Sequence, residues 1–317
     1  MKPRVMARLR ALVTWPPLNR VLTGVLRAVL PPRARRHPAV ARYAPRTGEV
    51  AAALPDGRLL RMFSRADDDV ASAIFWRGWA GHEPETAPLF YERARSAAVT
   101  LDIGAHVGYF ALLAAHANPD GRVYAFEPMA RVRERLERNL ALNGATNVTC
   151  VPLAVGSPAG SAEFFHVREG IPSSSSLSQS FMQSIVSRDA LTSTTVEVVE
   201  IDAYLAANAI SGVELVKIDT ETTEAAVFRG MLRTLREERP SVVCEVLDAD
   251  VAGAVEALLA PLDYAFFMLT TTAPRRCEHI RPDPRWRNYL FVPRERAATV
   301  AADPPPAASA ADATAPV

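Results

Sequence analysis

Short apolar runs that alternate with amphipathic segments constrain the fold of this chain more than any other feature. The first five runs are each followed by turn residues and then by a stretch with helical periodicity. The runs are residues 99–103, 122–126, 148–153, 215–218 and 241–246, and clear helical stretches are 109–117, 130–143 and 223–238. This alternation predicts a parallel sheet covered by helices on both faces. Two closely spaced runs, 264–269 and 289–293, predict an antiparallel edge pair. We therefore expect an α/β fold with a mostly parallel, seven-stranded sheet.

A glycine-rich turn after the first run is the strongest chemical signal. Over residues 102–110 it reads Asp-Ile-Gly-Ala-His-Val-Gly-Tyr-Phe, so that Asp102 ends a strand and a helix begins near Tyr109. The spacing differs from the G-x-G-x-x-G turn that holds the pyrophosphate of a dinucleotide. A carboxylate here would repel a phosphate, but it suits a ligand that carries an amino group and a sulfonium charge. The residues that we expect to contact this ligand are Asp102, Gly104, Ala105, His106, Gly108 and Tyr109.

The second run ends in an acidic residue, Glu127. In sheets of this kind the strand after the glycine turn delivers a carboxylate to the ribose hydroxyls of a bound nucleoside. We therefore predict that Glu127 holds both hydroxyls, with Pro128 next to it. Ala154, which follows the third run, is expected to flank the adenine.

More carboxylates follow the fourth and fifth runs. Asp219 ends the fourth, Glu221 and Glu224 come next, and Glu245 closes the segment Ser-Val-Val-Cys-Glu. Acidic residues in a first helical turn often only complement the helix dipole. Because the carboxyl ends of these strands meet where ligands bind in open α/β sheets, we expect Asp219, Glu221 and Glu245 to form a catalytic cluster.

Five blocks of the sequence, in this order, resemble those of FkbM-family methyltransferases. They are residues 102–110, Ala-Phe-Glu-Pro (125–128), Asn-Leu-Ala-Leu-Asn (139–143), Lys-Ile-Asp-Thr-Glu (217–221) and Arg-Pro-Ser-Val-Val-Cys-Glu (239–245). The resemblance extends from about residue 54 to residue 293. It implies a class I methyltransferase (Rossmann-like) fold, S-adenosylmethionine as cofactor, and O-methylation of sugars, glycolipids or polyketides. Two positions depart from the family pattern: His106 stands where asparagine is common, and Thr222 stands where glycine is common.

Methyl transfer to a hydroxyl needs an oxygen held in line with the methyl carbon and a group that removes its proton. Asp219 is our first candidate, either as general base or in a divalent-metal site with Glu221 or Glu245. Oxygen-only clusters suit Mg²⁺, but the resemblance requires no metal and we expect none. The acceptor is expected to be a small molecule or a glycolipid. Two alternatives stay open: a nicotinamide-dependent oxidoreductase, which the glycine spacing and Asp102 disfavour, and a non-catalytic nucleoside-binding protein, at which Thr222 hints.

Charge and composition divide the chain into three parts. The first 48 residues carry eleven Lys or Arg and no Asp or Glu, whereas the whole chain has a net charge of +1. We predict a basic N-terminal extension (1–46), a methyltransferase domain (47–296) and a disordered tail (297–317). The domain is expected to open with a hairpin and helical lid (47–95) before the core (96–296), and residues 157–195 are expected to form a long loop.

Charge and composition also limit which partners and which cellular compartment we expect. An almost balanced net charge gives no support for nucleic-acid binding, and three scattered cysteines suit a reducing cytoplasm. No apolar stretch is long enough to span a membrane. Two interpretations of the basic extension stay open: a poorly ordered segment, or short amphipathic helices that lie on the inner membrane surface or on a partner. No oligomeric state is predicted.

Overall fold

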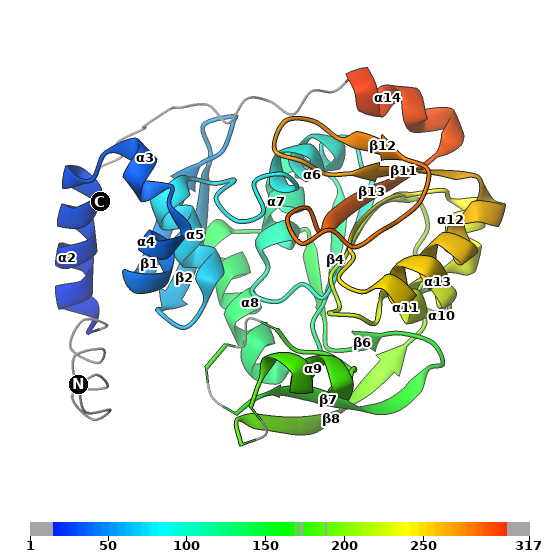
Figure 1. Ribbon diagram of the computed structural model, residues 1–317, viewed down its shortest axis with the longest axis horizontal. Coiled ribbons are helices and arrows are strands. Elements are labelled where there is room, and N and C mark those ends of the chain that lie inside the picture. The colour runs from blue at the N-terminus through cyan, green and yellow to red at the C-terminus, as the bar shows by residue number, and fades with distance from the viewer. Residues whose placement is uncertain (1–14, 169, 172–173, 188, 303–317) are drawn as a thin grey trace.

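The computed structural model describes residues 15–168, 170–171, 174–187 and 189–302 (Figure 1). Residues 1–14 of the predicted extension and 303–317 of the predicted tail lie outside the described residues. The main sheet has eight strands in the order β12-β11-β13-β10-β9-β3-β4-β5. Their bounds are β3 (Val99–Ile103), β4 (Arg122–Phe126), β5 (Val148–Val151), β9 (Val213–Ile218), β10 (Ser241–Glu245), β11 (Tyr264–Met268), β12 (Arg275–Cys277) and β13 (Asn288–Pro293).

The predicted α/β sheet is confirmed, with one strand more than expected. Strands β10, β9, β3, β4 and β5 run parallel, whereas β13, β11 and β12 are antiparallel to their neighbours. The extra strand is β12, an Arg-Arg-Cys segment at the edge of the sheet. It carries no apolar run because its side chains are exposed or only half-buried, so the sequence pattern gave no signal for it.

Helices cover both faces of this sheet. Side chains of α6 (Ala87–Ala94), α7 (Tyr109–Ala117) and α8 (Ala130–Asn143) pack into one apolar cluster. Those of α10 (Ile201–Ala207), α11 (Glu224–Arg229), α12 (Leu232–Glu237) and α13 (Ala249–Leu259) pack into the other. Neighbouring strand residues divide between the clusters, as in β10, where Val243 faces the first and Val242 the second. The parallel strands are therefore buried on both sides.

The expected long loop at 157–195 is wrong. Strands β6 (Ala154–Val155), β7 (Gly160–Val167) and β8 (Leu191–Val199) form a separate sheet in the order β6-β8-β7, and α9 (Gln179–Ile185) lies against β7 (Figure 1). Exposed and buried residues alternate in the middle of β7, where Glu163 is exposed and Phe164 is buried. β8 is rich in the β-branched residues that favour strands. The interruption is a small β-unit at the bottom of the view.

The N-terminal part consists of helices and a hairpin. Helices α2 (Pro16–Val29), α3 (Pro32–Arg35) and α4 (Pro38–Tyr43) precede β1 (Thr47–Ala53) and β2 (Leu59–Arg65), which pair antiparallel with Asp56 and Gly57 in their turn. Helix α5 (Asp69–Arg77) follows the hairpin. No helix in the described residues is long and apolar enough to cross a membrane.

The C-terminal end differs from the predicted tail. One short 3-10 helix follows α13 (η1, Ala260–Leu262) and a second follows β13 (η2, Arg294–Arg296). Residues Ala297–Ala302 then form helix α14, and Val300 is buried in the first cluster. The predicted disordered tail (297–317) is therefore wrong for residues 297–302. Val300 makes an apolar contact with the core, which a disordered segment lacks.

Candidate active site

A cleft of about 850 Å³ opens where strands β3, β4, β9 and β10 end. Its walls also include the N-terminal segment (Ala41, Pro45) and the small sheet (Phe164). All the predicted site residues line this cleft except Gly108. Those at the cleft are Asp102, Gly104, Ala105, His106, Tyr109, Glu127, Pro128, Ala154, Asp219, Glu221 and Glu245.

Two glycines shape the turn between β3 and α7. Gly104 has φ +81°, and a Cβ there would lie 1.9 Å from the carbonyl oxygen of Asp219 on β9. Gly108 has φ +88°, and its Cβ would lie 2.2 Å from Cδ1 of Leu136 on α8. Both positions therefore require glycine for contacts within the protein. Gly108 does not line the cleft and serves the packing of α7 against α8, and its expected contact with the ligand stays a prediction.

Asp102 ends β3 as a buried carboxyl group that is only partly satisfied. Its side chain is 2% exposed, and Oδ2 has no hydrogen-bond partner within the part of the chain that the structure describes. Burial raises the pKa of Asp102 to about 7, against the opposing charge of Lys217. A cationic ligand group placed at Oδ2 would supply the missing partner and favour the ionised form.

Glu127 is held rigidly at the end of β4. Its Oε2 accepts a hydrogen bond from the backbone N–H of His106 at 3.1 Å, and its Oε1 accepts one from that of Met129 at 2.9 Å. Burial raises the pKa of Glu127 to about 7, while these two bonds favour the charged form. A carboxylate offers about four acceptor sites, so Glu127 retains capacity for two hydroxyl donors in the cleft.

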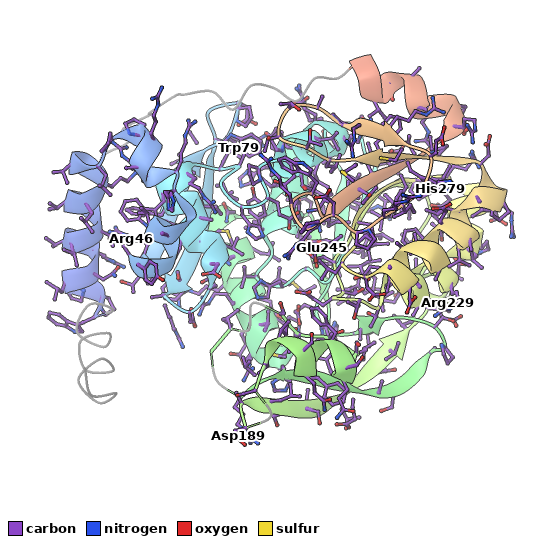
Figure 2. All side chains as sticks on the ribbon, in the orientation of Figure 1. Arg46, Trp79, Asp189, Arg229, Glu245 and His279 are labelled. Carbon is purple, nitrogen blue, oxygen red and sulfur yellow. The ribbon has the colours of Figure 1, made fainter. Side chains whose placement is uncertain are left out.

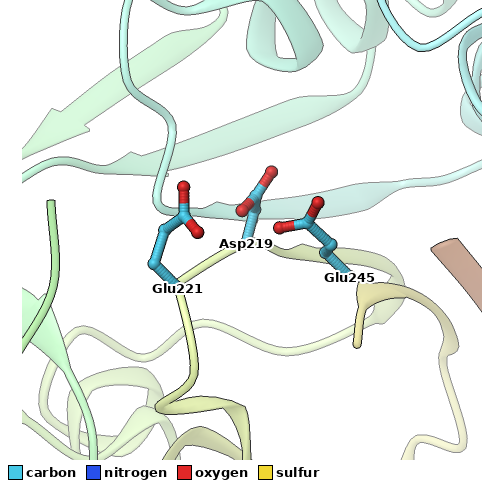
Figure 3. A group of neighbouring side chains, drawn as sticks. All are labelled: Asp219, Glu221 and Glu245. Carbon is cyan, nitrogen blue, oxygen red and sulfur yellow. The ribbon is translucent and has the colours of Figure 1, made fainter. Parts of the chain in front are cut away.

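The predicted acidic cluster assembles from β9 and β10 (Figure 3). Asp219, Glu221 and Glu245 each offer one oxygen, and these three oxygens lie within 4.8 Å of one another. Glu245 lies near the centre of the molecule (Figure 2). The chain therefore brings together, at the end of its central strands, the three groups that we expected to act in catalysis.

Lys217 sets the protonation of this cluster. The buried Lys217 Nζ lies 3.2 Å from Asp219 Oδ2 and 3.9 Å from Glu83 Oε2. Burial opposes ionisation of Asp219, but the lysine charge holds its pKa below the usual value. Burial, reinforced by the Asp219 charge, raises the pKa of Glu221 to about 7 and that of Glu245 to about 10. At neutral pH the cluster therefore combines an ionised Asp219, a protonated Glu245 and a Glu221 that titrates.

The turn after β9 holds residues in an unusual backbone conformation. Glu221 and Thr222 have φ of +54° and +77°, a region that L-residues rarely adopt. Glu224 stabilises the turn, since its Oε1 accepts from the backbone N–H groups of Thr220 and Thr222. Thr222 does not line the cleft, and its Oγ1 has no hydrogen-bond partner among the described residues. The departure from glycine thus affects the turn rather than ligand approach.

Several residues that line the cleft were not predicted from the sequence to be site residues. Lys217, Glu83, Ser174 and Arg287 all line the cleft, and Ser174 hydrogen-bonds Glu221. A lysine inside an otherwise apolar strand was a signal that could have singled out Lys217. Glu83 and Arg287 lie in loops that carry no comparable signal.

His82 lines the cleft too and packs edge-on against Tyr109 at 5.3 Å between ring centroids. Burial lowers the pKa of His82, so this imidazole is neutral at pH 7.

Comparison with known proteins gives one strong match and several distant ones. The sequence pattern described as the methyltransferase FkbM domain matches residues 102–267. The AMB antimetabolite synthetase AmbE of Pseudomonas aeruginosa is 34% identical over 142 residues, which is 38% of this chain and 6% of that protein. This chain thus spans only a small part of the length of that relative.

Among solved structures, methyltransferase FkbM from Methylobacillus flagellatus KT aligns with 17% identity and a TM-score of 0.43, covering 71% of this chain and 54% of that one. The O-methyltransferase TomG from Streptomyces achromogenes, solved in complex with SAM, aligns with 15% identity and a TM-score of 0.38, covering 65% and 77%.

The match to the family pattern extends over more than half of the chain. It begins at Asp102, ends within β11, and contains Glu127, Asp219 and Glu245. This chain belongs to the FkbM methyltransferase family.

Proposed function

We propose that this chain is an S-adenosylmethionine-dependent methyltransferase that methylates a hydroxyl group of a small-molecule or glycolipid acceptor. One observation carries the proposal. Asp102, with an unpartnered buried oxygen among the described residues, and Glu127, fixed by two backbone N–H groups, open into the same cleft as the Lys217–Asp219 pair. The ammonium group of a ligand fits Asp102, its ribose fits Glu127, and the hydroxyl group of an acceptor fits the Lys217–Asp219 pair.

The residues at the ends of β3 and β4 fit the cofactor. When bound, S-adenosylmethionine supplies an electrophilic methyl group on a sulfonium. Asp102 would pair with the ammonium group, which matches its missing partner. Glu127 would accept hydrogen bonds from both ribose hydroxyls. Ala154 and Pro128 would flank the adenine, since both line the cleft and follow the neighbouring strands β5 and β4.

The acceptor end of the cleft combines donors and acceptors of hydrogen bonds. A protonated Glu245 donates, an ionised Asp219 accepts, and Ser174 can do either. Such a mixture matches the several hydroxyl groups of a sugar ring. This supports a polyhydroxylated acceptor.

The charges favour a division of roles between two carboxylates. Lys217 lowers the pKa of Asp219 and so makes it a weak base, but a good acceptor that fixes the orientation of the hydroxyl. Glu221, with a pKa of about 7, lies closer to the value that suits a general base at neutral pH. We therefore assign proton removal to Glu221 and hydroxyl orientation to Asp219. Lys217 already places a positive charge beside the cluster, so no metal is needed for charge balance.

The test measures turnover against pH with labelled cofactor and an acceptor found by mass spectrometry of methylated extracts. Turnover of the native chain should rise with pH as Glu221 ionises, with the midpoint of the rise near pH 7. Glu221→Gln should lower turnover by about 10²–10⁴-fold and abolish this rise. Asp219→Asn should lower turnover comparably but keep a rise, moved to lower pH because the Asp219 charge no longer raises the pKa of Glu221, and a chelator should change nothing.

The exposed Glu134→Gln on α8 serves as the matched control and should behave like the native chain. A Glu221→Gln variant with native turnover and an unchanged pH profile would remove Glu221 from the reaction. Inhibition by the chelator, reversed by Mg²⁺, would assign the cluster to a metal instead.

A further inference from the structure

Helix α2 presents its apolar side to solvent. Val21, Val25 and Val29 are 66%, 55% and 68% exposed, and Trp15, just before the helix, is 58% exposed. Leu18 and Leu22 are also exposed. Residues three or four positions apart share one face of a helix, so Leu18, Leu22, Val25 and Val29 form one stripe, which Val21 widens. We call these five residues the apolar stripe.

The opposite side of α2 is attached to the body of the protein through the buried polar residues Asn19 and Thr23 and the partly buried Leu26. Asn19 is fully buried, and its Nδ2 donates to the carbonyl of Pro45 while its Oδ1 accepts from the backbone N–H of Thr47. Arg46 Nη1 donates to Thr23 Oγ1 and to the carbonyl of Arg20 (Figure 2). These bonds fix the rotation of the helix. The apolar stripe therefore faces outward because the opposite side is bound, and not because the helix is loosely placed.

The surroundings of the stripe are basic. Residues 15–48 contain seven Arg and no Asp or Glu. Arg20 on α2 and Arg33 and Arg36 beside it are exposed. Figure 1 shows α2 at the margin of the molecule, on the far side of the hairpin from the main sheet. A second copy docked stripe to stripe would bring like charges together, which disfavours self-association.

We propose that the apolar stripe of α2 docks on an anionic lipid bilayer, with the helix in the plane of the interface. Valine, leucine and tryptophan side chains enter the boundary between headgroups and acyl chains, and the flanking arginines contact anionic headgroups. The Pro31–Pro32 pair and α3 follow the helix directly, so Arg33 and Arg36 lie close to its C-terminal end. This inference does not depend on the proposed reaction.

Co-sedimentation of the full-length chain with vesicles tests the proposal. Vesicles of phosphatidylcholine mixed with phosphatidylglycerol should carry the chain down, and vesicles of phosphatidylcholine alone should do so far less. The triple variant Val21→Gln, Val25→Gln, Val29→Gln should reduce binding at least about tenfold, because apolar burial supplies much of the affinity. The matched control is Ile185→Gln, which removes an equally exposed apolar side chain from α9 and should bind like the native chain.

A second variant separates the charge contribution. Arg33→Gln with Arg36→Gln should weaken binding to the mixed vesicles by about fivefold per arginine, and high salt should have the same effect on the native chain. Thermal unfolding of every variant verifies folding, and glutamine is a good helix former. No sedimentation of the native chain, or binding that survives the triple substitution, would overturn the proposal. A dimer of the native chain that the triple variant converts to a monomer, without vesicle binding, would assign the stripe to a second copy.

Discussion

Individual carboxyl groups in the cleft differ in charge because they differ in their partners. Lys217 keeps Asp219 ionised, whereas burial outweighs the opposing charge of Lys217 at Asp102 and of Arg133 at Glu127 and raises the pKa of both carboxyl groups to about 7. Both groups that carry the proposed cofactor contacts are thus left partly neutral in the ligand-free protein. A positively charged ligand would complete them.

The pH dependence of stability should report Asp102. Burial raises its pKa from 3.8 to about 7, so the folded protein binds this proton more tightly than the unfolded chain does. A raised folded-state pKa contributes stability at low pH that is lost as the pH rises through the folded value. Between pH 3.8 and about 7 the native chain should therefore lose unfolding free energy relative to Asp102→Asn. Denaturant unfolding of both chains without ligand measures this difference. Asp120→Asn, at an exposed turn, is the control, and a constant difference between Asp102→Asn and the native chain would contradict the burial argument.

Thr222 should be replaceable by glycine with a gain in stability. Its φ of +77° strains a β-branched residue, and its buried hydroxyl has no partner among the described residues. Strain of this kind costs about 1–3 kcal/mol, and the greater chain entropy of glycine offsets about 1 kcal/mol of the relief. Thr222→Gly should therefore raise the free energy of unfolding by roughly 1 kcal/mol.

Denaturant unfolding measures this gain. The same change at Thr194, an exposed strand residue, should lower stability instead. Equal losses at both positions would show that the turn tolerates threonine without strain.

At this scale the sequence predicted residues at strand ends and missed those brought in by loops. Asp102, Glu127 and Asp219 follow apolar runs, and parallel strands bring such positions to one edge. Glu83 reaches Lys217 from a loop before α6, where no periodicity fixes its position. Gly108 was predicted to contact the ligand because it lies in the glycine-rich turn. Its close approach to Leu136 joins two helices, and the sequence pattern does not show such a contact.

At the scale of elements, regular strands and helices of the core follow from apolar periodicity, and deviations have local causes. The predicted single helix at 223–238 is two helices, α11 and α12. Asp202 causes the break, because its carboxylate accepts from the backbone N–H groups of Arg233 and Thr234 and so caps a new helix. The small sheet escaped detection because all but one residue of β8 are exposed or half-buried and the strand begins without an apolar run.

Periodicity indicated that the basic extension contains amphipathic helices, but it did not show which residues attach α2 to the body of the protein. An amphipathic pattern usually indicates that the apolar side packs inward. Here Asn19 and Thr23 are buried, and the apolar stripe is exposed. The hydrogen bonds of Asn19 to Pro45 and Thr47 fix the rotation of α2 about its axis. These contacts join residues far apart in the sequence, so the periodicity of the helix does not indicate them.

Asn19→Ala should therefore detach this element. It removes bonds of 2.8 Å to the Pro45 carbonyl and to the Thr47 N–H, and leaves both backbone groups near an apolar methyl. An unsatisfied buried group costs about 1–3 kcal/mol, so the unfolding free energy of the N-terminal segment should fall by that amount. Amide hydrogen exchange of α2 measures it. Asn208→Ala, at an exposed helix end, should leave exchange in α2 unchanged, and native-like exchange in the Asn19 variant would show that Asn19 does not anchor the helix.

At the scale of the whole molecule, the cleft is a meeting point of three parts. The core supplies Asp102, Glu127 and Asp219, the small sheet supplies Phe164, and the N-terminal segment supplies Ala41 and Pro45. The sequence predicted the core as the site and treated residues 1–46 as an addition to it. Because Ala41 and Pro45 line the cleft, the predicted boundary at residue 46 cuts through its wall.

The central claim is that this cleft binds S-adenosylmethionine rather than a nicotinamide dinucleotide. Calorimetric titration of the native chain with S-adenosylhomocysteine and with NAD tests it most directly. We expect saturable binding of S-adenosylhomocysteine, at least about tenfold weaker in Glu127→Ala and unchanged in the exposed Glu134→Ala, and no binding of NAD. Saturable binding of NAD without binding of S-adenosylhomocysteine, or equal affinities in Glu127→Ala and the native chain, would contradict it.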